Sequence, residues 1–292
     1  MTGSGFWVLQ FLNAMQFSML LFLLSIGLTV IFGLLHFVNL AHGALYMMGA
    51  YLGVSLAAMT GSYWPAFFLA PVGVTLIGAV LYFTLIDRLR GAGPMNQVLV
   101  TFGLIFVFLD IVRMGWGDIA RGIAVPQLLA GTTRLLGVDY PTYRLFIIVL
   151  GLIIMAALMI ILTRTQIGAM IRASVENGPM ASSMGINVGR LFFAVFCVGC
   201  ALAGLAGVVA APVFSATPGM GVAILIPALI VVVIGGLGSL QGAIVGSLIV
   251  GFLQTLGAAV FPQLAAVLVY ALLALILVLR PQGLIPVRGG AH

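Results

Sequence analysis

The sequence predicts an all-α fold, a polytopic bundle of helices integral to a membrane, and three observations support that prediction. Of the 292 residues, 63% are hydrophobic and 5% are charged, whereas a soluble domain carries about 25% charged residues. The mean hydropathy is +1.33. The apolar runs are continuous, as in membrane-crossing helices of about 20 residues, and do not alternate as β-barrel strands do. We therefore expect one membrane domain over residues 1–292.

Nine apolar stretches are expected to be membrane segments. The first is long enough to include a break or a tilt, and the last two come from one run that "FPQ" at 261–263 divides. Eight or nine of the stretches cross the membrane, depending on whether one of them is broken or re-entrant. In chain order they are 8–35, 44–60, 64–86, 97–115, 143–162, 191–212, 222–237, 243–260 and 264–279.

The charged residues predict the orientation of the chain. All eleven basic residues are arginines. Residues 87–91, 164–190 and the tail from Arg280 together hold seven arginines against two acids, whereas residues 110–144 hold four arginines against three acids. The positive-inside rule places the first three regions in the cytoplasm, the N-terminus outside and the C-terminus inside. Because these arginines serve orientation, we expect no nucleic-acid partner.

The motif "HFVNLAHG", residues 36–43, interrupts the apolar pattern. His36, Asn39 and His42 are polar, and the last two share one face if the segment is helical. Polar groups at membrane depth normally face a bundle interior or a cavity, and interrupted helices in transporters offer backbone groups to a solute. We favour a role for Asn39, His42 and Gly43 in lining or gating a pathway. The alternative is a short turn between the first two segments.

Glycines four residues apart predict close packing between helices, because small residues let helix backbones approach in lipid. Gly238, Gly242 and Gly246 have this spacing and are expected on one helix face. Gly49 and Gly53 form a second pair.

The residue inventory disfavours an ion-coupled carrier and an enzyme. Asp110 is the one acid inside an expected segment, and Arg113 is placed to pair with it, so a buried carboxylate relay is missing. Ser239 lacks the G-x-S-x-G context of a hydrolase. Cys197 and Cys200 are read as apolar helix residues, not as a redox pair. No catalytic, cofactor-binding or metal-binding residue is predicted.

The absence of lysine excludes a P-loop from this chain. If ATP supplies the energy, another subunit binds it, and residues 163–190 are where that subunit would dock. "NGP" at 177–179 is expected to break a helix and to open a second, shorter one. The alternative is an amphipathic helix lying on the membrane surface. The first helix sets apolar residues on one face against charged residues opposite: Ile167, Met170, Ile171 and Val175 against Arg172 and Glu176.

Five segments of the chain, in this order, resemble the permeases of branched-chain amino acid ABC importers. They are "VIFGLLHFVNLAHGALYMMGAYLG" (30–53), "VLVTFGLIFVF" (98–108), "TRTQIGAMIRASVENGPMASSMGI" (163–186), "VIGGLGSLQGAIVG" (233–246) and "LVLRPQGL" (277–284). The resemblance implies that Asn39, His42 and Gly43 match the family's Asn-x-x-His-Gly element. It also implies a coupling segment that contacts the ATPase through Arg172, Ala173, Glu176, Asn177, Ala181, Gly185 and Ile186.

The resemblance further implies a single permease domain without its own ATPase site. Its expected partners are a second related permease, two cytoplasmic ATPases that hold ATP and Mg, and an extracytoplasmic solute-binding protein. The expected location is the bacterial inner membrane. The solute would be a branched-chain amino acid or a similar small polar or amphipathic molecule, such as an amide, urea or an aromatic acid. The alternative is a secondary carrier or facilitator that acts alone.

Overall fold

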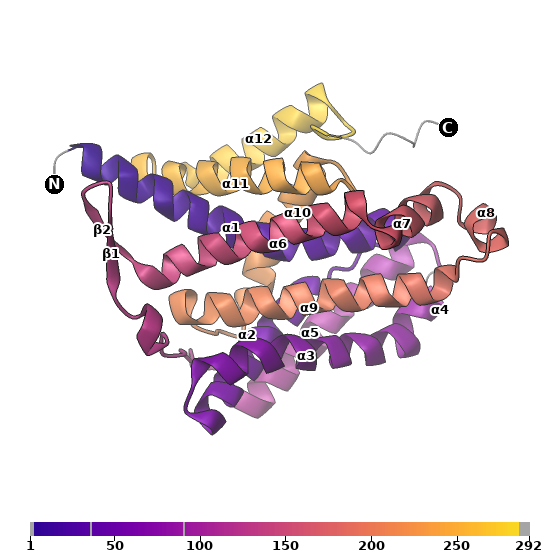
Figure 1. The fold of residues 1–292 in the computed structure, drawn as a ribbon, viewed down its shortest axis with the longest axis horizontal. Helices are drawn as coiled ribbons and strands as arrows, with labels where there is room; N and C mark the ends of the chain where they lie inside the picture. Colours follow the sequence, from indigo (N-terminus) through magenta and orange to yellow (C-terminus); the bar gives the residue numbers. More distant parts are fainter. Residues whose placement is uncertain (1–2, 36, 90, 286–292) are drawn as a thin grey trace.

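The computed structural model describes residues 3–35, 37–89 and 91–285, and nine apolar helices dominate this part of the chain (Figure 1). Each coincides with one expected stretch, so the polytopic all-α fold is confirmed. His36, Arg90 and Arg288 lie outside the described residues. Seven helices are long enough to span a membrane, and α10 (Met220–Gly235) and α12 (Ala265–Leu279) are shorter. The seven are α1 (Gly3–Leu35), α2 (His42–Thr60), α3 (Tyr63–Leu81) with its continuations η1 (Tyr82–Ile86) and α4 (Asp87–Leu89), α5 (Pro94–Trp116), α6 (Thr142–Arg164), α9 (Val188–Phe214) and α11 (Leu240–Val260).

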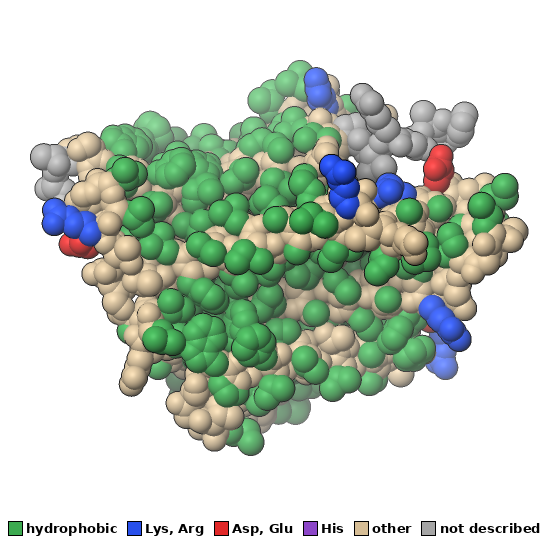
Figure 2. Space-filling model, in the orientation of Figure 1, with side chains coloured by type: hydrophobic (Ala, Val, Ile, Leu, Met, Phe, Trp, Pro, Cys, Tyr) green, Lys and Arg blue, Asp and Glu red, His purple; other side chains and the backbone are tan. Residues whose placement is uncertain are grey.

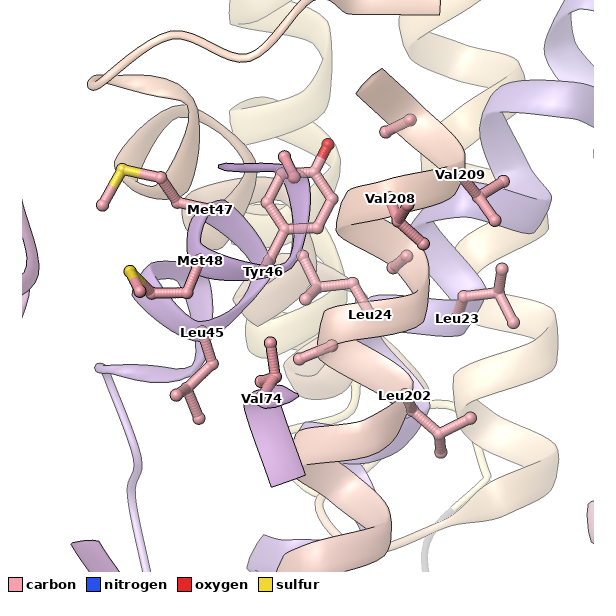
Figure 3. Close-up of a cluster of buried hydrophobic side chains, with 14 of the residues drawn as sticks. Leu23, Leu24, Leu45, Tyr46, Met47, Met48, Val74, Leu202, Val208 and Val209 are labelled. Atoms are coloured by element: carbon pink, nitrogen blue, oxygen red, sulfur yellow. The ribbon is translucent and has the colours of Figure 1, made fainter. Parts of the chain in front are cut away.

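Helix α1 forms the centre of the bundle. Its 33 residues make one unbroken helix, about 50 Å long against a hydrocarbon core of about 30 Å, so the helix is tilted or protrudes from the core. Every residue from Ser18 to Thr29 is buried, as expected for a helix that is apolar on all sides. It packs against α9 and α11. Figure 3 shows its Leu23 and Leu24 in one cluster of buried side chains with Val208 and Val209 of α9.

Glycines admit the closest contacts between helices. A Cβ at Gly49 would lie 2.6 Å from the Cα of Gly204, and one at Gly53 would lie 2.6 Å from Val208, so α2 packs directly on α9. Gly242 and Gly246 of α11 face the backbone of α10 in the same way. Gly238 does not share their helix face, because it lies in the turn before α11 with φ of +79°. That part of the expectation is wrong.

The two ends of the bundle carry different structures (Figure 1). The N-terminus lies at one end beside a hairpin of β1 (Thr132–Leu135) and β2 (Val138–Pro141), paired antiparallel with Leu135 opposite Val138. The turn residues Leu136 and Gly137 both have positive φ, as a two-residue hairpin turn of type I′ requires. The short helices α7 (Gln166–Glu176) and α8 (Gly178–Ser183) lie at the other end, with the last described residues. This division matches the two sides that the arginines predict.

The hairpin is tied to α1 by one amide oxygen. Oδ1 of Asn13 accepts hydrogen bonds from the Tyr140 hydroxyl at 3.1 Å and from the Arg144 guanidinium at 2.8 Å. Burial raises the pKa of the Tyr140 hydroxyl, and the positive charge of Arg144 acts in the opposite direction. The phenol therefore stays protonated and remains a donor.

The charges lie at the ends of the bundle. Figure 2 shows Arg, Asp and Glu side chains gathered at both ends of the visible face, with a largely hydrophobic surface between them. The exposed residues of α6 include Val149, Leu152, Ile153 and Ile160. An apolar band between charged ends is the surface that a bilayer requires.

Candidate functional site

The chain after α1 turns back into the bundle before α2 begins. His42, the first residue of α2, is completely buried, and its Nε2 lies 3.1 Å from the carbonyl oxygen of Leu24. Leu24 precedes Leu35, the end of α1, by eleven residues, or about 16 Å along the helix. Helix α2 therefore starts deep inside the bundle, level with Leu24 of α1 and not at the end of that helix.

Two polar atoms at this interruption have no hydrogen-bond partner among the described residues. A carbonyl oxygen only accepts, so Nε2 of His42 carries the proton and donates to Leu24. In the neutral ring Nδ1 is then an acceptor, and it is buried without a partner. Oδ1 of Asn39 is also a buried acceptor without a partner, in a side chain only 1% exposed. Two such acceptors match a group that donates hydrogen bonds.

The start of α2 meets the start of α10. Gly43 and Gly221 are both buried, and a Cβ at Gly221 would lie 2.6 Å from the carbonyl oxygen of Gly43. The backbones of the two helices therefore approach closely at Gly43, with Gly221 as its partner. The N-terminus of α2 has no side-chain cap. Two helices thus begin next to each other inside the bundle, an arrangement that transporters use near their solute sites.

Residues 163–190 form two short helices with a break between them, as the sequence predicts. Thr165 caps α7, with its side chain accepting from the Gly168 amide at 3.3 Å, and Asn177 caps α8, accepting from the Met180 amide at 2.9 Å. Arg172 donates to the carbonyl oxygen of Leu162 at the end of α6. The caps and this bond fix α7 against the bundle and leave α8 projecting from it.

The residues expected to contact an ATPase are mostly exposed. Arg172, Ala173, Glu176, Asn177 and Gly185 are exposed, whereas Ala181 is buried at 2%. Exposure of the first five residues is what a docking surface requires, whereas Ala181 is the buried residue of α8.

The apolar side chains of this segment are partly accessible. On the predicted apolar face of α7, Ile167 is 52% exposed, whereas Met170, Ile171 and Val175 are partly buried. Met180 and Met184 were not singled out, and they are 59% and 76% exposed. Flexible methionine side chains suit a protein-binding surface. A signal was present in the sequence, since both methionines follow the break at 177–179 within a few residues.

A cavity lies at the end of the bundle opposite α7 and α8. Its volume is about 790 Å³, and it is lined by the end of α2, the start of α3 and residues 122–128. Arg121 and Ala216 exchange backbone hydrogen bonds of 2.9 and 2.7 Å next to it. These bonds anchor the segment after α5 to the connection between α9 and α10.

The side chains considered for other chemistry have structural roles. Ser239 caps α11, accepting from the Gly242 amide at 3.0 Å. Asp110 lies 3.9 Å from Arg113, which also contacts Asp118 at 2.9 Å, so the expected local ion pair is confirmed. Cys200 is buried, and neither it nor Cys197 forms a disulfide.

The family described as "Branched-chain amino acid transport system / permease component" matches residues 10–279. The chain belongs to this family. The branched-chain amino acid transport permease BraD of Pseudomonas aeruginosa is 30% identical, covering 94% of both chains. Two permeases of Salmonella typhimurium also match: LivH at 28% identity, covering 94% of both chains, and LivM at 26%, covering 92% of this chain and 68% of LivM.

One solved structure is similar in fold, PsaBC from Streptococcus pneumoniae in complex with Fab. Its TM-score is 0.50 with 15% sequence identity, covering 91% of this chain and 89% of the other. The chain is therefore a multi-pass membrane protein of the branched-chain amino acid permease family, whose named members are transport subunits.

Proposed function

We propose that this permease is one membrane subunit of an ABC importer that moves a branched-chain amino acid, or a similar small amphipathic solute, by alternating access. The relatives BraD, LivH and LivM are named for branched-chain amino acid transport. The observation that carries the proposal is the exposed pair α7 and α8, which projects from one end of the bundle and is anchored through Arg172.

The assembly we propose has parts on both sides of the bacterial inner membrane. Two ATPases bind ATP and Mg and dock on α7 and α8 in the cytoplasm, and a second related permease completes the channel. The N-terminus lies outside and the C-terminus inside. An extracytoplasmic binding protein delivers solute at the end with the 790 Å³ cavity.

In this proposal, the interrupted helices α2 and α10 are the elements that move during transport. Asn39, His42 and Gly43 lie where α2 and α10 begin together. Separation of the two helix starts would bring the acceptors of Asn39 and His42 into contact with a solute that carries an ammonium group. A weak site with few hydrogen bonds suits an importer, because the solute has to leave it.

Purification and reconstitution test the proposal. The tagged permease should co-purify with an ABC ATPase, and uptake into proteoliposomes should require both ATP and the binding protein. Uptake by the permease alone, driven by a solute or ion gradient, would establish the secondary carrier instead.

A further inference from the structure

Helix α5 makes little contact with the rest of its own chain. It packs mainly against α2. Its buried residues form one narrow stripe, three or four residues apart: Gln97, Thr101, Ile105, Phe108 and Val112. Most of the opposite surface is exposed, including Leu99 and Phe106 at 69% and 52%.

Gly103, near the middle of α5, has open space where a neighbour would be. A Cβ built there meets nothing within 4 Å. Away from the helix ends, every other glycine of the nine apolar helices, in the part of the chain that the structure describes, has a neighbour inside that distance. Those glycines admit another helix, as small residues do in membranes. Gly103 differs from them, because no described residue of this chain packs against it.

Polar residues lie on the same side of α5. Asn96 and Asp110 are exposed and stand seven residues before and after Gly103. The Asp110 side chain is 62% exposed, and Asp110 precedes the end of α5 at Trp116 by six residues, about 9 Å. Ionisable residues within membrane helices normally face protein or a water-filled cavity and not lipid. The exposed residues in the middle of α6, by contrast, are apolar.

We propose that this surface, the Gly103 face (Asn96, Leu99, Gly103, Phe106 and Asp110), is the contact with a second permease related to LivM. The inference rests on the proposed function. Salmonella typhimurium has two distinct branched-chain amino acid permeases, LivH and LivM, that both match this chain, so a partner of the same fold is the occupant to expect. Asp110 and Arg113 side by side offer both charges to such a helix.

Photo-crosslinking in the full complex tests the contact. Phe106 and Phe68 are exposed phenylalanines, at 52% and 64%, on α5 and α3, so each is replaced separately by p-benzoylphenylalanine. Illumination of membranes should attach peptides of the LivM-related permease at position 106 and lipid at position 68. Attachment of lipid alone or of a second copy of this chain at position 106, or of the permease equally at both positions, would overturn the inference.

A second variant tests the open space at Gly103. Gly103→Leu fills open space, so the unfolding temperature of the permease should not change. The amount of the second permease that co-purifies with this variant should fall at least about tenfold. The matched control is Ala156→Leu, at an exposed position of α6, which should change neither quantity. Full recovery with Gly103→Leu, or a loss of folded protein, contradicts the contact. Co-purification of the ATPase with wild-type permease remains the separate test of the proposed function.

Discussion

Gly43 and Gly221 lie backbone against backbone, at the points where α2 and α10 begin inside the bundle. A Cβ on either residue would meet the carbonyl oxygen of the other. The two glycines are separated by 178 positions in the chain, and their contact brings two interrupted helices together beside Asn39 and His42.

Gly43→Ala should destabilise the permease, because the new methyl group would also lie 2.9 Å from Cβ of Leu225. Overpacking of this kind costs about 1–3 kcal/mol, so the unfolding temperature of the detergent-purified protein should fall. Gly219→Ala is the matched control, since a Cβ there meets nothing within 4 Å. Equal unfolding temperatures for both variants would contradict the close packing.

Asn39→Leu should separate transport from stability. Oδ1 of Asn39 is buried without a partner, so an apolar side chain of similar size should leave the free energy of unfolding unchanged or raise it. Loss of one hydrogen bond to solute, about 1 kcal/mol, should slow uptake roughly fivefold at saturating binding protein. The affinity of the binding protein for solute should stay the same. Wild-type uptake by the folded variant would remove Asn39 from the pathway.

Glu176→Arg should impair coupling to the ATPase without unfolding the permease. Glu176 is exposed on α7, four residues after Arg172, so the charge reversal costs at most roughly a few tenths of a kcal/mol within the helix. Solute-stimulated ATP hydrolysis by the assembled complex should fall. Gln166→Arg, at the exposed first residue of the same helix, is the control and should retain stimulation. Equal hydrolysis rates for the two variants would place the ATPase contact elsewhere.

Cysteine labelling should report the orientation. Single cysteines at Ser4 and Thr132, introduced after replacement of Cys197 and Cys200, should react with an impermeant thiol reagent added to intact cells. A cysteine at Ser182 should react only after the cells are opened. All three positions are exposed, so burial does not confuse the result. Labelling of Ser182 in intact cells would reverse the orientation that the arginines predict.

Much of the local structure could be predicted from the sequence. The nine apolar stretches, the division at 261–263, the break at Asn177 and the pair of Asp110 with Arg113 all appear as expected. These features depend on residues close together in the chain. A membrane-crossing segment has to be apolar over its whole length and to satisfy its own backbone groups. It can therefore be recognised from its own residues.

The tertiary structure alone decided which apolar surfaces face each other. Residues that face lipid and residues that face the core are both apolar in a membrane bundle, so the pattern of α1 does not show that it lies at the centre. Spacing placed Gly238 on a helix face, whereas the chain turns there. It also could not show that Gly43 meets Gly221 or that Gly103 meets nothing. Those contacts join helices that are far apart in the sequence. In lipid, such contacts depend on how closely the shapes of two helix surfaces fit together.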